Sequence, residues 1–171
     1  MMKKIVLSII ILVSILAADN GREGAMTAIG LGIGSVSSSL DGKKSVGVVD
    51  TSWALKFGYG FTPNLVAFAE GSIQAVTKDL EQNSIGVGLS YYLEDAPNSP
   101  YFSVYIGDVE HSIVSTVPDS SSGSFGDLWK LGVGYEYKQW FFQVDYINAE
   151  SSRVKSDGVF GSIGYNFHIF R

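Results

Sequence analysis

Five charged residues are the first candidates for chemistry, because each occurs in a segment whose other residues are mostly apolar or small. They are Lys56, Glu70, Lys130, Glu136 and Asp145. In an apolar setting such groups pair with one another, since an unpaired buried charge is costly, or they relay protons or ions. We interpret the set as a structural ion-pair network and keep a proton- or ion-conducting path as the alternative.

The histidines offer little scope for catalysis. His111 is followed by Ser112, and the other histidine is His168. Neighbouring residues of a strand point to opposite faces, so His111 is poorly placed to activate Ser112, and no GxSxG elbow is present. Two histidines without cysteine make a metal site improbable. We therefore expect no catalytic residue, no metal and no cofactor.

The elements that position these residues are predicted to be β-strands. Apolar and small or polar residues alternate with a period of two, most clearly over 53–61 and 129–137, and this period is typical of strands. No helical periodicity of useful length follows the first 18 residues. We predict eight strands, at 25–36, 50–61, 65–76, 83–93, 101–113, 127–138, 140–151 and 158–170.

The connections between the predicted strands alternate in character. The short ones are Thr62-Pro63-Asn64, residues 94–100 and Lys138-Gln139. The others are polar and mostly longer, at 37–49, 77–82, 114–126 and 152–157. Short turns at one end and longer loops at the other are typical of outer-membrane barrels, whose turns are periplasmic and whose loops are extracellular.

The two faces of each strand differ in bulk. Ile29, Leu31 and Ile33 alternate with Gly30 and Gly32. A soluble barrel would turn the bulky face inward and overfill an eight-stranded lumen, so we expect this face to meet lipid and the charged residues to face the lumen. Lys56 and Glu70 are each seven residues from Pro63, so we expect them to lie opposite each other and to form an ion pair. The residues predicted to face lipid include Leu31, Leu55, Phe57, Leu89, Val133 and Val144. A soluble secreted sandwich or lipocalin-like barrel is the alternative.

Aromatic residues gather near the strand ends that meet the short turns. Tyr59, Tyr92, Tyr101, Phe141 and Phe167 are among them. Rings at one level along a barrel form an interfacial girdle, and we predict such a girdle here.

The amino-terminal residues predict export. Lys3 and Lys4 precede an apolar run over 5–16 and the small residues Ala17 and Ala18, which is the pattern of a secretory signal. The run is shorter than the ~20 residues of a membrane-spanning helix. We assign residues 1–18 to a cleaved signal peptide and residues 19–171 to one barrel domain.

Composition limits the classes of partner. Without Lys3 and Lys4 the chain has 10 basic and 17 acidic residues, a formal charge of −7, so nucleic acid is a poor partner. The absence of cysteine argues against a disulfide framework and against a lipid-anchored lipoprotein.

The carboxyl-terminal residues resemble the assembly signal of bacterial outer-membrane barrels. Ser162, Gly164, Phe167 and Ile169 match it in order, although the chain ends at Arg171 rather than at a phenylalanine. In length, strand count and this tail the chain resembles the small OmpX-like and OmpA-transmembrane-type barrels of the porin family. The resemblance implies the outer membrane of a Gram-negative bacterium, with outer-membrane lipid and the barrel assembly machinery as partners.

These observations predict an all-β fold: an eight-stranded antiparallel up-and-down transmembrane β-barrel. We expect a non-enzymatic protein with a structural, adhesion or partner-binding role, and an extracellular ligand would be bound through the loops. A narrow passive pore is the first alternative, and a lipid-modifying outer-membrane enzyme is the second.

Overall fold

The computed structural model describes residues 22–40, 43–45, 49–77, 80–113 and 123–168. These residues form nine β-strands: β1 (Gly24–Leu40), β2 (Lys43–Ser45), β3 (Val49–Thr62), β4 (Leu65–Thr77), β5 (Leu80–Tyr92), β6 (Asn98–Ile113), β7 (Gly123–Tyr137), β8 (Trp140–Ser151) and β9 (Val154–His168). None of the described residues lies in a helix that is long and apolar enough to cross a membrane.

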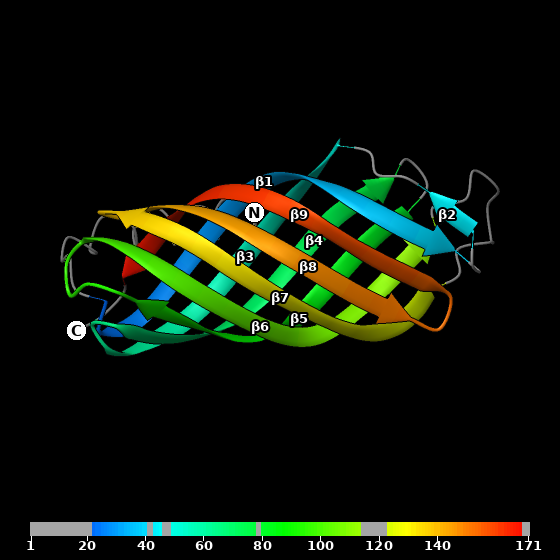
Figure 1. The fold of residues 1–171 in the computed structure, drawn as a ribbon. Helices are drawn as coiled ribbons and strands as arrows, with labels where there is room; N and C mark the ends of the chain where they lie inside the picture. The colour runs from blue at the N-terminus through cyan, green and yellow to red at the C-terminus, as the bar shows by residue number, and fades with distance from the viewer. Residues whose placement is uncertain (1–21, 41–42, 46–48, 78–79, 114–122, 169–171) are drawn as a thin grey trace, which may run out of the picture.

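Eight of the strands close into a barrel (Figure 1). From β3 to β9 each strand pairs antiparallel with the next, and β1 pairs with both β3 and β9. The short β2 pairs only with the end of β1, where Leu40 lies opposite Lys43. The predicted fold, an all-antiparallel eight-stranded barrel, is confirmed, and β2 is an addition that alternation did not reveal.

The barrel has a turn end and a loop end, at left and right in Figure 1. The turn end carries the connections at 63–64, 93–97 and 138–139, and the loop end carries those from β1 to β3, β4 to β5, β6 to β7 and β8 to β9.

The outward face of the barrel is apolar, as the alternation predicts. Leu31, Phe57, Leu89, Val133 and Val144 point away from the lumen and are each 47–64% exposed. The sixth predicted residue, Leu55, lies on the same face and is half-buried. So much exposed apolar surface on a closed barrel is the pattern of a membrane-spanning barrel.

Aromatic side chains bound this apolar band on both sides. On β7, Trp129 packs against Tyr146 with 5.4 Å between ring centroids, and Tyr137 marks the other limit. Eight residue steps separate Trp129 from Tyr137, or about 26 Å of strand at ~3.3 Å per residue. With the ~40° tilt of barrel strands this gives a band about 20 Å tall, close to the ~25 Å of outer-membrane barrels.

Three of the predicted loops are wrong, because strands occupy most of their residues. The residues 37–49 were expected to be a loop, yet β1 runs to Leu40, β2 covers Lys43–Ser45 and β3 begins at Val49. The residues 77–82 were expected to be a loop, yet β4 ends at Thr77 and β5 begins at Leu80. The residues 152–157 were also expected to be a loop, yet β9 begins at Val154. Strands that rise above the apolar band carry polar residues on their outward face too. Hydrophobic alternation therefore does not distinguish them from loops.

The aromatic girdle contains fewer residues than the sequence predicts. Tyr92, Tyr101 and Phe141 point into the lumen and are each 4% exposed. Their rings occupy space left by inward-facing glycines: a Cβ on Gly164 would lie 2.2 Å from Phe141 Cζ, and one on Gly134 would lie 2.4 Å from Tyr101 Cζ. Each of these aromatics has an aromatic neighbour in the chain, so only one of each pair can face outward.

Candidate functional site

The lumen holds the charged residues that the sequence singled out, and side chains fill most of it. Cavities of about 30 and 20 Å³ remain between the lumen-facing side chains. A cavity of this size holds about one or two water molecules, since one water needs ~10–15 Å³ of such volume. The lumen is therefore best described as a stack of side-chain layers.

The central layer is a three-membered ion pair. Lys56 lies directly opposite Glu70 across β3 and β4, with 3.3 Å between Nζ and Oε2. Lys130 reaches the other carboxylate oxygen, Oε1, from β7 at 2.6 Å, and it also donates to Ser72 Oγ at 3.1 Å. Glu70 and Lys130 are buried, so the carboxylate of Glu70 is bound by two lysines that approach it from different strands.

Asp145 joins this layer through an amide. Gln143 Nε2 donates to Asp145 Oδ1 at 2.5 Å. Gln143 Oε1 accepts from the Tyr101 hydroxyl at 2.8 Å and from Lys56 Nζ at 3.4 Å. The sequence analysis missed Gln143 because it is neutral, although it shares the lumen face of β8 with Asp145, two residues away.

An apolar layer covers the charged layer on the side of the loop end. It consists of buried side chains from six strands: Val36, Phe68, Tyr105, Val109, Leu128, Ile147, Ala149, Val154 and Phe160. Its aromatic rings also contact the lysines: Lys130 Nζ lies 4.6 Å from the centroid of the Tyr105 ring, and Lys56 Nζ lies 5.0 Å from that of Phe68. The lysines thus lie between a carboxylate and π faces, which attract cations.

A polar cluster around His111 fills the lumen nearest the loop end. His111 is 0% exposed, and its ring nitrogens lie 3.1 Å from Ser151 Oγ and 3.1 Å from Gln82 Oε1. The outward-facing residues of β6 around His111 are Asp108, Glu110 and Ser112 rather than apolar residues, so the cluster lies above the apolar band. Burial lowers the pKa of His111 to about 4, which keeps the ring neutral near pH 7.

The His111 cluster does not include the neighbouring hydroxyl of Ser112. Ser112 lies on the opposite face of β6, as predicted, and the serines that do approach the ring are Ser151 and Ser156. Both hydroxyls are buried with His111 inside the barrel. The second histidine, His168, is buried in the lumen at the turn end.

Glu136 lies apart from the other predicted charges, at the turn end. Its Oε1 accepts from Arg22 Nε at 2.9 Å. Its Oε2 accepts from the Tyr92 hydroxyl at 3.1 Å and from Asn166 Nδ2 at 2.5 Å. Arg22 was missed because it precedes the first predicted strand. The signal that could have found it is the need of a buried carboxylate for a cation.

The predicted assembly signal is divided between the two faces of β9. Ser162 and Gly164 face the lumen, while Phe167 lies on the outward face. Ile169 lies outside the described residues.

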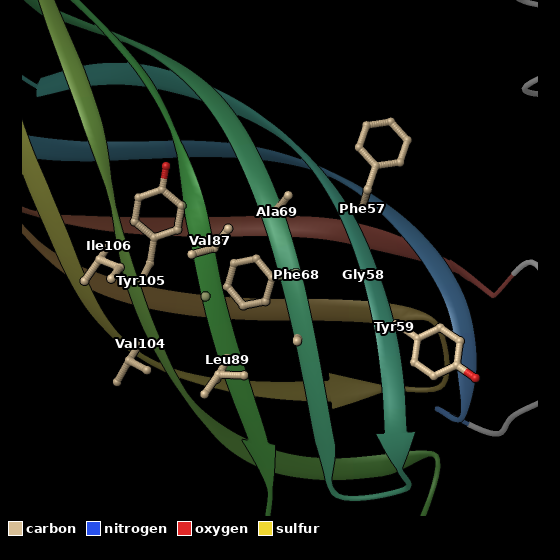
Figure 2. A pocket seen from close by; sticks show the side chains of 12 residues that line it. Phe57, Gly58, Tyr59, Phe68, Ala69, Val87, Leu89, Val104, Tyr105 and Ile106 are labelled. Atoms are coloured by element: carbon tan, nitrogen blue, oxygen red, sulfur yellow. The ribbon is translucent and has the colours of Figure 1, made fainter.

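An open groove of about 670 Å³ crosses the outward face over β3 to β6 (Figure 2). Ala67 and Ala69 of β4 form its floor, and Phe57, Val87 and Ile106 belong to its walls. It lies within the apolar band, so lipid is its ordinary surrounding.

Among the described residues no three histidine, aspartate or glutamate side chains gather in a way that could hold a metal ion. No protein-family model matches the chain, and no curated protein does.

Several solved structures share the fold. The attachment invasion locus protein Ail of Yersinia pestis has a TM-score of 0.59 and 16% identity, over 85% of this chain and 99% of Ail. Neisserial surface protein A has a TM-score of 0.59 and 17% identity, over 84% of this chain and 99% of its own. The outer-membrane protein OprG of Pseudomonas aeruginosa has a TM-score of 0.50 and 19% identity, over 87% of this chain and 99% of OprG.

These identities are low, so the likeness concerns the fold. It extends over nearly the full length of each of the three proteins, and it agrees with the closed barrel and its outward apolar band. This chain has the fold of the small eight-stranded outer-membrane β-barrels.

Proposed function

We propose that this chain is a non-conducting, non-enzymatic outer-membrane barrel whose role is carried by its extracellular end. The observation that supports this is the filled lumen: an ion-pair layer, an apolar layer and the His111 cluster follow one another along the barrel. A pore needs a continuous wetted path, and a hydrolase needs an accessible nucleophile. The described part of the interior has neither feature, so we place partner or ligand binding at the loop end.

In this proposal the turn end is periplasmic and the loop end extracellular, as in other outer-membrane barrels. Residues 1–18 serve as the export signal. Outer-membrane lipid surrounds the apolar band. The tail from Ser162 to Ile169 is recognised by the assembly machinery.

The charge of the loop end narrows the class of extracellular ligand. Ail has been crystallised with the heparin analogue sucrose octasulfate. Here Asp108 lies opposite Asp127, and both are exposed on the outward face above the apolar band. Like charges placed side by side repel an anion, so we infer a ligand or cell surface that is neutral or cationic at this face.

The test is conductance in planar lipid bilayers, with an open porin as positive control. We expect the purified barrel to insert without a steady single-channel current. A stable open-channel current would overturn the proposal in favour of the pore. Lipid mass spectrometry of membranes with and without the protein tests the enzyme alternative, and we expect identical spectra.

A second measurement tests the extracellular role. The barrel in lipid nanodiscs should bind heparin weakly, and a D108N/D127N variant should bind it more strongly. Tight binding of the unaltered protein to heparin would contradict the inferred ligand class.

A further inference from the structure

The residues just before β1 cross the turn end of the barrel. Gly24 has a φ of 94°, a left-handed conformation that glycine adopts without strain, and it turns the chain from β1 beneath the barrel. Residues Arg22 and Glu23 then pass close to Gly60: a Cβ there would lie 1.7 Å from the carbonyl oxygen of Arg22. We call residues 22–24 the strap. It can lie against β3 only because position 60 has no side chain.

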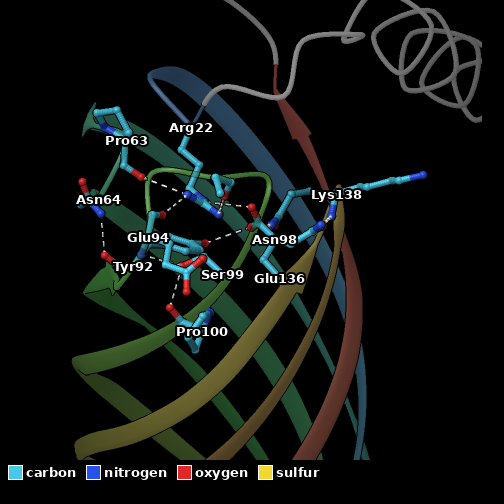
Figure 3. Close-up of polar contacts among 12 residues, drawn as sticks. Arg22, Pro63, Asn64, Tyr92, Glu94, Asn98, Ser99, Pro100, Glu136 and Lys138 are labelled. Carbon is cyan, nitrogen blue, oxygen red and sulfur yellow. Dashed lines mark hydrogen bonds and ion pairs between the residues drawn. The ribbon is translucent and has the colours of Figure 1, made fainter.

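The side chain of Arg22 joins the strap to the connections of the turn end (Figure 3). Its Nη1 donates to the carbonyl oxygen of Pro63 at 3.2 Å and to that of Glu94 at 3.1 Å. Its Nη2 donates to the carbonyl oxygen of Ala96. One guanidinium therefore binds both the β3–β4 turn and the β5–β6 connection, which the planar, five-donor geometry of arginine allows.

Two lumen residues hold the same guanidinium from the other side. Glu136 of β7 accepts from Nε, and the centre of the guanidinium lies 4.0 Å from the centroid of the Tyr92 ring. Arg22 is only 3% exposed, although it belongs to no strand. A buried charge with this many partners is fixed in place, because leaving it would strand Glu136 and three carbonyl groups.

We propose that the strap closes the turn-end mouth of the barrel and that Arg22 is the latch that holds it closed. Directly behind this mouth lies the cavity of about 20 Å³ lined by Ser90, Tyr92 and Asn166. Release of Arg22 opens that compartment to solvent. Lys56 also lines this cavity, and its ion-pair partners Glu70 and Lys130 lie beyond it, so the rest of the lumen stays closed.

The chain has no cysteine, so single cysteines can report access to each compartment. Ser90→Cys reports the compartment behind the mouth. Ser84→Cys reports the lumen beyond the ion-pair layer, where Ser84 contacts Ser72 at 2.7 Å. Each is placed in the otherwise unaltered chain and combined with Arg22→Lys or Arg22→Met. The folded barrel in micelles is then labelled with a small, charged methanethiosulfonate, and folding is checked by heat-modifiable gel migration.

We expect Ser90→Cys to label slowly in the parent and at least about tenfold faster with Arg22→Met, the factor given by ~1.4 kcal/mol of lost closure. Arg22→Lys should give an intermediate rate, since lysine cannot bind both connections and Glu136 together. Ser84→Cys should stay slow in every background, and none of the variants should conduct.

A backbone variant keeps the test decisive if the Arg22 substitutions fail to fold. Gly60→Ala keeps the arginine side chain in the sequence but displaces the backbone of the strap at Arg22, and it should also speed labelling at Ser90→Cys. The matched control is Gly71→Ala on β4, where the nearest heavy atom lies 3.9 Å from the new Cβ and no change is expected. Unchanged labelling of Ser90→Cys in a folded Arg22 or Gly60 variant would overturn the proposal. Equal acceleration at Ser84→Cys would do so too, because the whole barrel would then have loosened.

Discussion

Glu70 is the residue on which the centre of the lumen depends most, because it alone carries the negative charge that binds two lysines. Glu70→Gln leaves Lys56 and Lys130 without their shared carboxylate. We expect it to lower the free energy of unfolding by roughly 3–5 kcal/mol, the cost of breaking a buried ion pair. Lys130→Met should lower the free energy of unfolding more than Lys56→Met does, since Lys130 is closer to Glu70 and more buried. Urea unfolding in lipid vesicles measures all three.

The control for Glu70→Gln is an exposed ion pair of the same chemistry. Glu150 contacts Lys155 on the outward face, and both side chains are more than half exposed. Glu150→Gln should therefore cost less than about 1 kcal/mol. If both substitutions lower the free energy of unfolding by the same amount, the buried ion pair is no more stabilising than the exposed one. A Lys56→Met/Glu70→Gln double variant should cost less than the sum of its single variants, as expected for residues in contact.

His111 makes the stability of the barrel depend on pH. Its pKa falls from an ordinary value near 6.5 to about 4 on burial, so between these values the unfolded chain binds a proton that the folded chain does not. The free energy of unfolding should therefore decrease as pH falls from 6.5 towards 4. His111→Gln removes this contribution, so the stability difference between the two proteins should change over that window. A difference that is constant from pH 7 to pH 4 would contradict the neutral buried histidine.

At the scale of the single strand, β1 tests which face meets lipid. Leu31 lies at the middle of the apolar run from Ile29 to Ile33, on the outward face. Leu31→Arg should cost about 2–4 kcal/mol, the value for arginine at the bilayer midplane. Ser35→Arg, on the same face four residues towards the loop end, should cost about 0–1 kcal/mol. Equal stability of Leu31→Arg and the parent in lipid would show that the facing is wrong.

The whole barrel has a direction in the membrane that labelling of intact cells can establish. Ser152 lies in the exposed β8–β9 connection at the loop end, and Asp95 is exposed in the β5–β6 connection at the turn end. With the turns in the periplasm, an impermeant maleimide should label Ser152→Cys on intact cells and label Asp95→Cys only after the outer membrane is permeabilised. The reverse labelling pattern would show that the barrel has the opposite orientation in the membrane.

The sequence by itself determined the class of fold and the facing of the strands. A period of two is a local property, so alternation at Ile29, Leu31 and Ile33 was enough to assign lipid and lumen faces. The sequence also predicted that Lys56 lies opposite Glu70, because each is seven residues from Pro63 and antiparallel partners equidistant from a turn face each other. The structure has this pair.

Only the tertiary structure decided what the remaining charges meet. Lys130 reaches Glu70 from three strands away, and Glu136 meets Arg22 from before β1. Neither contact could be read from the chain, because both depend on the tilt and stagger that the barrel acquires when β1 pairs with β9. The polar strand segments above the apolar band were missed for a related reason. Above the band the outer face meets water, and the inner face carries polar residues such as Gln82 and His111. Both faces are therefore polar, and the alternation of apolar and polar residues is lost, although the strands remain paired.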